Sequence, residues 1–252
     1  MVFLVCNWKM APEKDTQATD LVKKTLVLAR TYKKSLSVVV CPPYIHIPTV
    51  GKIAKATIGL GAQNVSASVE IANTGDVSAA MLKSYKTSYC IVGHSEVRAK
   101  GETNKDIAEK VLQLLEKKIT PIICVGERAR DAQGWYLSEV KDQLETVLQA
   151  VPENALKKVL IAYEPVWAIG KNAVREATTH ECQEMIIFIR KVIADHANEK
   201  ISASIPVLYG GSVDEKNANS YVTEGGAQGF LVGRVSLDAK RLNALAKSVS
   251  EK

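Results

Sequence analysis

The chain has 252 residues, of which 46% are hydrophobic and 24% are charged, a balance typical of a folded globular protein. Its 33 lysines and arginines exceed the 27 acidic residues, giving a net charge of +6. The basic residues are spread among acidic ones, and no basic run with interleaved aromatic residues indicates nucleic-acid binding. No apolar run approaches the ~20 residues that span a membrane. Because the apolar start lacks a basic leader, we expect no signal peptide and a cytoplasmic protein.

Short β-branched runs alternate along the chain with longer segments of helical periodicity. Several runs are almost continuously apolar, for example VVVC at residues 38–41 and PIICV at residues 121–125. Strands that are apolar on both faces are typical of parallel sheets covered by helices. We predict strands at residues 3–9, 37–41, 58–64, 89–95, 121–126, 159–167, 205–210 and 229–233.

Helical signals fill most of the gaps, at residues 15–34, 103–118, 137–150, 178–198, 214–222 and 236–248. The pairs Thr103 with Asp106 and Thr178 with Glu181 have the spacing of a capping box at a helix start. No linker or low-complexity stretch divides the chain, so we expect one domain over residues 1–252. This α/β alternation fits either a (β/α)8 barrel or a large doubly wound sheet.

The placement of polar residues favours the barrel. They follow the carboxyl ends of most predicted strands, at Asn7 and Lys9, Asn64, His94 to Glu96, Glu127, Glu164, Gly210 to Ser212, and Gly233. In a barrel these ends converge on one face, where active sites lie. In an open sheet the first, fourth and eighth strand ends cannot all reach one small ligand.

The segment AYEPVWAIG at residues 162–170 places Glu164 at a strand end, before a loop with bulky apolar residues. Glu164 is a candidate general base, and the loop is a candidate lid that excludes water. The alternative is that Glu164 caps a helix or pairs with Lys9. His94, at another strand end, is a candidate acid or electrophile, although a single histidine is more often an ordinary packed residue.

Two glycine-bearing turns, YGGSV at residues 209–213 and FLVGR at residues 230–234, follow the seventh and eighth predicted strands. Glycine lets backbone N–H groups approach an anion, and loops at these positions form the common phosphate site of such barrels. No second histidine or cysteine lies at ligand spacing from His94, so we expect no metal. The five cysteines lack CxxC spacing and mostly lie in apolar runs, which predicts free buried thiols.

The chain resembles the triosephosphate isomerase family in motifs that span almost its whole length. They are NWKM (7–10), GAQN (61–64), TGDVS (74–78), GHSE (93–96), ICVGE (123–127), YEPVWAIG (163–170), YGGSV (209–213) and FLVG (230–233). The resemblance implies a single-domain TIM barrel that interconverts dihydroxyacetone phosphate and glyceraldehyde 3-phosphate through an enediolate, without a cofactor or metal, in glycolysis and gluconeogenesis. It also implies a homodimer that binds neither nucleic acid nor membranes.

The resemblance assigns roles residue by residue. Glu164 matches the base and His94 the electrophile, while Lys9 matches the cation that offsets substrate charge, positioned by Asn7 and Glu96. The backbones of Gly170, Ser212, Gly233 and Arg234 match the phosphate grip, with Asn7 and Lys9 also at the substrate. Thr74, Gly75 and Asp76 match the loop that reaches the neighbouring subunit.

Three positions depart from the family pattern. Val97 stands where the first of two arginines is usual, so we expect altered contacts near the dimer loop. KNAVRE at residues 171–176 replaces the usual continuation after Gly170, which alters the far hinge of that loop. Arg234 replaces a second glycine, which is unfavourable if that position needs a positive φ. We expect its N–H to donate. Its side chain either contacts the phosphate or points outward, and we favour the outward direction.

Two rival functions remain at this stage. Another phosphate-binding barrel enzyme, such as a sugar-phosphate epimerase, would need metal ligands or a different pair of bases at the strand ends. A non-catalytic descendant would bind a sugar phosphate or a protein partner. The intact set of Asn7, Lys9, His94 and Glu164 argues against such a loss of activity.

Overall fold

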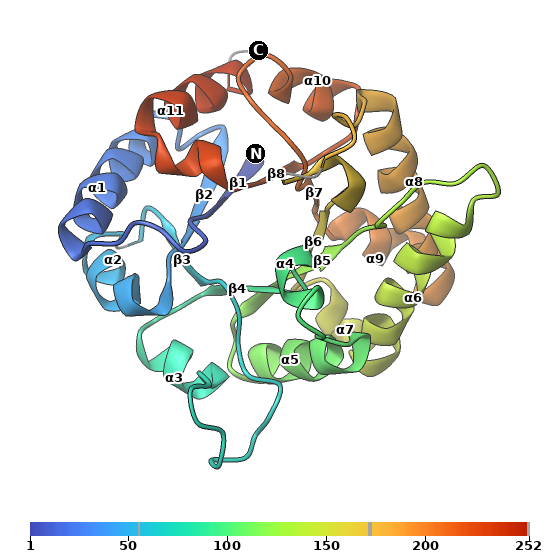
Figure 1. Cartoon of the computed structure of the whole chain (residues 1–252), viewed down its shortest axis with the longest axis horizontal. Coiled ribbons are helices and arrows are strands. Elements are labelled where there is room, and N and C mark those ends of the chain that lie inside the picture. Colours follow the sequence, from blue (N-terminus) through green and yellow to red (C-terminus); the bar gives the residue numbers. More distant parts are fainter. Residues whose placement is uncertain (55, 171–172, 251–252) are drawn as a thin grey trace.

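The computed structural model describes residues 1–54, 56–170 and 173–250. Its strands run parallel and close into an eight-stranded barrel in sequence order, which excludes the doubly wound alternative. The strands surround the centre of the molecule in Figure 1. They are β1 (Val2–Asn7), β2 (Leu36–Cys41), β3 (Gly59–Ala62), β4 (Tyr89–Val92), β5 (Thr120–Val125), β6 (Leu160–Tyr163), β7 (Val207–Tyr209) and β8 (Gly229–Val232).

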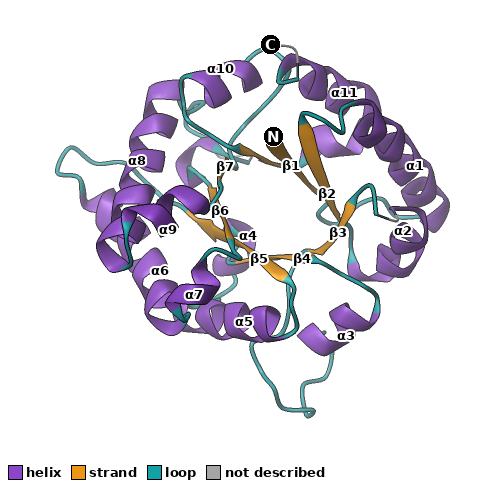
Figure 2. Cartoon of the chain, turned by 180° about the vertical axis from the view of Figure 1, so that it is seen from behind, coloured by secondary structure: helices purple, strands orange, loops and turns teal. Residues whose placement is uncertain are grey.

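Helices form an outer ring around the barrel, seen from the opposite side in Figure 2. The α-helices are α1 (Asp15–Thr31), α2 (Ile47–Ala54), α3 (Ala79–Ser84), α4 (Ser95–Arg98), α5 (Asn104–Glu116), α6 (Trp135–Ala150), α7 (Glu153–Leu156), α8 (Thr179–His196), α9 (Glu199–Ser204), α10 (Ala218–Thr223) and α11 (Ala239–Ser248). Short 3-10 helices in the described part of the chain are η1 (Tyr44–His46), η2 (Val166–Ala168) and η3 (Arg234–Leu237). Within the described ranges, no helix has the length and apolar character needed to cross a membrane.

Side chains alternate between the two faces of each strand, and both faces are buried, which explains the continuous apolar runs in the sequence. Val38 and Val40 pack in the outer core against the helices, whereas Val39 and Cys41 belong to a separate inner cluster. Successive side chains of a strand point to opposite faces, so both faces of β2 are buried. The inner cluster fills the barrel with Val5, Val39, Cys41, Ile91, Ile122, Cys124, Leu160, Ala162, Leu208 and Leu231. The five cysteines are buried and free, as predicted.

The barrel closes where β1 pairs with β8, with Phe3 opposite Gly229. A Cβ on Gly229 would lie 2.2 Å from the carbonyl oxygen of Phe3. Closure at this register therefore requires glycine, because no side-chain atom fits between the two backbones.

The predicted strands extend too far at their carboxyl ends. Residues 8–9, 93–95 and 164–167 lie in turns or short helices, since β1, β4 and β6 end at Asn7, Val92 and Tyr163. The barrel ladder stops where the polar site residues begin, and these residues take irregular backbone. The sequence prediction also missed the short helices α2, α3, α4, α7 and α9, most of them too short to form without tertiary packing.

Both predicted capping boxes are present, at Thr103 with Asp106 and at Thr178 with Glu181. Glu181 also accepts two hydrogen bonds from Arg175, at 2.9 and 2.5 Å. Arg175 is the main cause, ahead of the Thr178 hydrogen bonds, that lowers the pKa of Glu181 from 4.5 to about 2.

Replacing Glu181 by Gln is expected to lower the free energy of unfolding at pH 7 by about 1 kcal/mol, since the Arg175 pair is half exposed. A carboxylate with a depressed pKa in the folded state stabilises above its ordinary pKa and loses that effect as pH falls. The difference between parent and E181Q should therefore shrink between pH 5 and pH 2 in urea unfolding. E109Q, at an exposed position on α5, is the control, and an equal pH dependence in it would contradict the assignment.

Candidate active site

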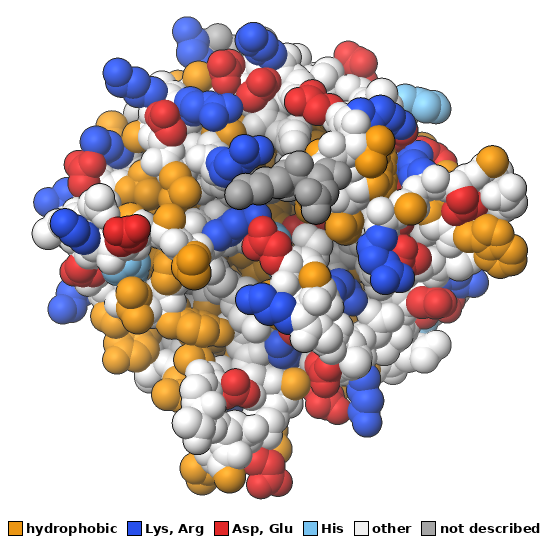
Figure 3. Space-filling model, viewed as in Figure 1, with side chains coloured by type: hydrophobic (Ala, Val, Ile, Leu, Met, Phe, Trp, Pro, Cys, Tyr) orange, Lys and Arg blue, Asp and Glu red, His pale blue; other side chains and the backbone are white. Residues whose placement is uncertain are grey.

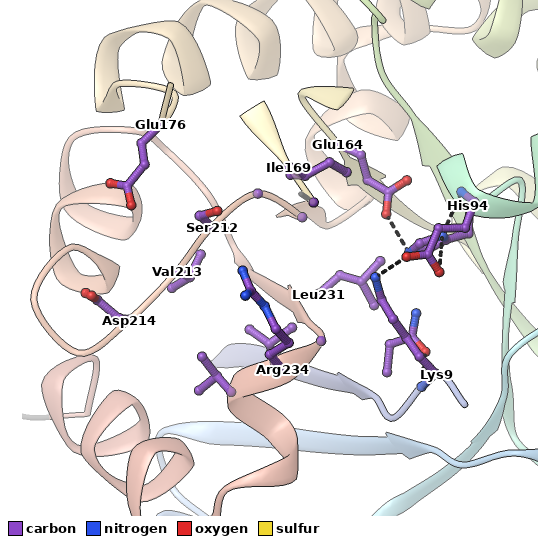
Figure 4. A pocket seen from close by; sticks show the side chains of 18 of the residues that line it. Lys9, His94, Glu164, Ile169, Glu176, Ser212, Val213, Asp214, Leu231 and Arg234 are labelled. Carbon is purple, nitrogen blue, oxygen red and sulfur yellow. Dashed lines mark hydrogen bonds and ion pairs between the residues drawn. The ribbon is translucent and has the colours of Figure 1, made fainter. Parts of the chain in front are cut away.

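A cavity of about 690 Å³ opens at the carboxyl ends of the strands. Figure 4 shows side chains from loops that follow different strands pointing into this one space. The predicted catalytic and phosphate-binding residues all line it: Asn7, Lys9, His94, Glu96, Glu164, Gly170, Ser212, Gly233 and Arg234. Barrel closure thus brings together residues that are up to 227 positions apart in the chain.

Glu164 follows the last residue of β6 and is 3% exposed. Its backbone N–H donates to the Val125 carbonyl at 2.8 Å, which holds it beside β5. Its Oε2 accepts from the Ser95 N–H at 2.9 Å, and its Oε1 lies 3.1 Å from His94 Nε2. Glu164 therefore does cap a helix, as one alternative proposed, because Ser95 is the first residue of α4. It does not pair with Lys9, the other alternative, since Lys9 pairs with Glu96.

The hydrogen bonds of His94 define its tautomer. Its Nδ1 accepts from the Glu96 backbone N–H at 3.2 Å, so that nitrogen carries no proton. The proton of the neutral ring is then on Nε2, which faces Glu164 Oε1. His94 is 6% exposed, and its Nε2–H is placed to donate to an oxygen in the cavity.

Lys9 takes a rare backbone conformation for a non-glycine residue, with φ of 53°. The Asn7 side chain accepts from its N–H at 3.0 Å, and the Gln63 side chain donates to its carbonyl at 2.8 Å. Lys9 Nζ lies 2.5 Å from Glu96 Oε1. Burial alone would raise the pKa of Glu96, but the Lys9 hydrogen bond and charge outweigh burial and lower it. Asn7 and Gln63 thus hold the strained backbone, and Glu96 holds the ammonium group.

The structure gives a second physical reason why glycine stands in the two predicted phosphate turns. A Cβ on Gly210 would lie 2.9 Å from Glu164 Cγ, and one on Gly233 would lie 3.2 Å from Lys9 Cε. Neither glycine has a positive φ, so crowding rather than a left-handed backbone is the reason: Gly210 has no room beside Glu164, and Gly233 leaves space for the flexible end of Lys9. These turns therefore leave room for the side chains of Glu164 and Lys9 as well as for an anion.

Sequence reasoning gave no role to several residues that position this site. Ser95 and Gln63 contact Glu164 and Lys9 directly, as described above. Gln143 of α6 accepts from the Gly126 N–H at 2.8 Å and donates to its carbonyl at 3.0 Å, beneath Glu164. The GHSE and GAQN motifs contain Ser95 and Gln63 and were the only sequence signal for them. No local signal indicates a role for Gln143, which lies in the middle of a helix.

Glu127, which the sequence placed after the fifth strand without a role, anchors the start of the loop after β6. Its fully buried Oε1 accepts from Trp167 Nε1 at 2.7 Å, from the Tyr163 hydroxyl at 2.9 Å and from Arg130 Nε at 3.2 Å. At the far side of that loop, the Tyr221 hydroxyl donates to the Ala177 carbonyl at 2.5 Å. The start of the loop is thereby fixed to Glu127, which follows β5, and its far side to α10.

The three departures have separate outcomes. Arg98 donates to the carbonyls of Gly93 at 2.7 Å and Cys124 at 3.1 Å, so it supports the turn that carries His94. Lys171 and Asn172, at the altered loop, lie outside the described residues.

Arg234 begins η3 without a positive φ, so an arginine in place of glycine causes no backbone strain there. The expectation that its side chain points outward is wrong, because it lines the cavity.

Comparison with known proteins agrees with this geometry. The sequence pattern of the triosephosphate isomerase family matches residues 2–249. The chain belongs to the triosephosphate isomerase family. It is 37% identical to the triosephosphate isomerase of Methylococcus capsulatus, over 98% of each chain. It is 38% identical to that of Nitrosomonas eutropha, over 94% of this chain and 93% of the other.

Membership of the triosephosphate isomerase family makes this chain an isomerase with a TIM barrel fold, as the sequence predicted. The family interconverts dihydroxyacetone phosphate and glyceraldehyde 3-phosphate in glycolysis. The epimerase and non-catalytic alternatives are therefore set aside.

Proposed function

We propose that the cavity carries out this interconversion by proton transfer, with Glu164 as the base. Glu164 takes a proton from the carbon next to the substrate carbonyl, and the electron pair moves onto the carbonyl oxygen to form an enediolate. The proton returns to the former carbonyl carbon. The hydroxyl proton of the first carbon moves to the former carbonyl oxygen, so the carbonyl and hydroxyl groups exchange places and the reaction needs no cofactor or metal. The supporting observation is the 3.1 Å approach of His94 Nε2 to Glu164 Oε1, inside a cavity that Lys9 also lines.

We assign His94 and Lys9 to the charge that develops on the substrate oxygens. The Nε2–H of neutral His94 donates to the enediolate oxygen, and the Lys9 ammonium offsets its negative charge. Fixed donors and cations in a partly dry site stabilise such an anion more than water does. Asn7 holds the Lys9 backbone and Glu96 holds its ammonium group, at 3.0 and 2.5 Å, so both act as positioning residues.

We assign the substrate phosphate to the other end of the cavity. Gly170, Ser212, Gly233 and Arg234 line the cavity and have backbone N–H groups that can donate to an anion. Figure 4 shows Ser212 and Arg234 on the side of the cavity opposite His94. A three-carbon phosphate lying between the two ends reaches both the base and the phosphate site.

A coupled assay with glyceraldehyde 3-phosphate tests this function directly. We expect turnover that a phosphoglycolate-type inhibitor suppresses and that EDTA does not change. Activity that disappears on EDTA treatment would favour a metal-dependent enzyme instead.

We also propose a homodimer built around Thr74, Gly75 and Asp76. This loop protrudes beside α3 in Figures 1 and 2, and Gly75 within it has φ of 94°. Exposed apolar side chains lie on the loop itself, at Val69 and Ile71, and in or directly after α3, at Met81 and Tyr85. Met10 and Ile45 are exposed as well. Figure 3 shows hydrophobic side chains gathered on this part of the surface. An apolar patch of this kind supports a protein–protein interface.

A second cavity of about 360 Å³ lies next to the loop and is lined by Asn64, Val97, Glu102 and Lys110 among others. A protruding loop beside a cavity on the same surface is self-complementary, as a twofold dimer requires. Val97, one of the departures, lines this cavity and would face the partner loop.

Ile71→Asp is expected to convert the dimer into a monomer, because it places a charge in the apolar interface. The loss of one buried isoleucine costs about 1.5–3 kcal/mol, so the dissociation constant should rise at least tenfold. Light scattering reports the mass, and circular dichroism checks the fold. Val27→Asp, at another exposed apolar position, on α1, should stay dimeric. A monomeric parent with full activity would refute the dimer.

Two further assignments complete the proposal. We propose that residues 1–252 act as one isomerase domain and that the protein works in the cytoplasm, where free thiols persist. Cell fractionation with an antibody to the chain tests the location.

A further inference from the structure

We propose that the guanidinium of Arg234 binds the substrate phosphate and is a specificity-determining residue for its negative charge. This inference rests on the proposed function, which uses only the backbone N–H of Arg234. It adds a side-chain cation to a site otherwise described by backbone N–H groups.

The position of Arg234 places its side chain over the phosphate end of the cavity. It is the first residue of η3, directly after Gly233, and it is exposed. Figure 4 shows the side chain extending from η3 into the cavity, toward the segment of Ser212 and Val213. The same cavity wall contains the backbone groups proposed to grip the phosphate.

The Arg234 guanidinium has no hydrogen bond or ion pair with any other described residue. Lys9, another cation that lines the cavity, differs because it is paired with Glu96 at 2.5 Å. Arg98 and Arg130 are likewise held by carbonyl or carboxylate oxygens. A guanidinium that faces a cavity unpaired can bind a ligand without first breaking an internal contact.

The charge of the cavity lining favours such a group. Among the described residues that line the cavity, four are carboxylates, Glu96, Glu164, Glu176 and Asp214, and three are cations, Lys9, Arg234 and Arg241. Backbone N–H groups offer hydrogen bonds but no net charge, and a phosphate ester carries about two negative charges at neutral pH. Without Arg234, two cations would face four carboxylates among these described lining residues. The planar guanidinium also matches phosphate oxygens in a bidentate manner.

Arg234→Gln tests the inference, since glutamine keeps much of the length and loses the charge. We expect KM for glyceraldehyde 3-phosphate and Ki for inorganic phosphate to rise about 10- to 100-fold, as loss of a charge-assisted hydrogen bond predicts. We expect kcat to change little, and turnover of unphosphorylated glyceraldehyde to stay the same. Arg234→Lys should recover part of the phosphate affinity, because it restores the charge without the bidentate geometry.

Arg241→Gln is the matched control, an arginine on α11 that lines the same cavity. An equal loss in R241Q and R234Q would show a general effect of cavity charge and overturn the specific contact. So would a Ki for phosphate in R234Q within twofold of the parent. Calorimetric titration with inorganic phosphate needs no turnover, so it tests Arg234 even if the parent fails to isomerise glyceraldehyde 3-phosphate, an outcome that would refute only the proposed reaction.

Discussion

Replacing Glu164 by Gln is expected to lower kcat by about 10²–10⁴-fold, the usual contribution of a positioned base. The amide keeps the size of the side chain and can still accept the Ser95 N–H, which lies 2.9 Å from Oε2 in the parent. It cannot take a proton from carbon at neutral pH. Binding of inorganic phosphate should remain largely intact, because the phosphate end of the cavity is unchanged.

The matched control for this variant is Glu176→Gln, a second carboxylate that lines the same cavity. Figure 4 shows Glu176 on the far side of the cavity from His94, so its loss should leave kcat within a few-fold of the parent. Steady-state kinetics of the two variants separates the base from a general effect of cavity charge. Full activity in E164Q would remove Glu164 from the role of base.

Replacing Gly126 by Ala is expected to damage both stability and catalysis. A Cβ at this position would lie 1.7 Å from the carbonyl oxygen of Glu164 and 2.6 Å from its carbonyl carbon. These are backbone atoms, and Gly126 cannot retreat because Gln143 holds its N–H and its carbonyl. We expect the free energy of unfolding to fall by about 2–3 kcal/mol, as for other overpacked cores.

The same clash pushes Glu164 away from His94. A displacement of about 1 Å of a reacting group lowers the rate about 10²-fold, so kcat of folded G126A should fall by that order. Urea unfolding and coupled assays measure the two effects. Gly51→Ala is the control, because its Cβ would meet only the flexible end of the Leu60 side chain, at 3.0 Å. Wild-type stability in G126A would show that β5 and β6 can separate at this point.

Much of the fold was determined locally and was predictable. Apolar runs such as residues 38–41 mark strands buried on both faces, because Val39 faces the barrel interior and Val40 the helices. Capping residues such as Thr178 mark helix starts by direct contact with residues three positions away. The positions of Lys9, His94 and Glu164 after the first, fourth and sixth strands predicted the site, since barrel closure brings strand ends to one face.

Local sequence carried no information about contacts made across the closed barrel. Nothing near Ser95 indicates that its N–H meets Glu164, 69 residues away. The Gln143 clamp on Gly126 also depends on where α6 packs against β5, and the direction of Arg234 depends on how η3 starts after Gly233.

Local signals such as the hydrophobic period, turn glycines and helix caps act over a few residues. The sequence by itself therefore determined the order and type of the major elements and which residues follow the strands. Distances and partners in the cavity depend on strand register and on packing between distant elements. Only the tertiary structure decided those, because their energies arise from atoms that the chain brings together on folding.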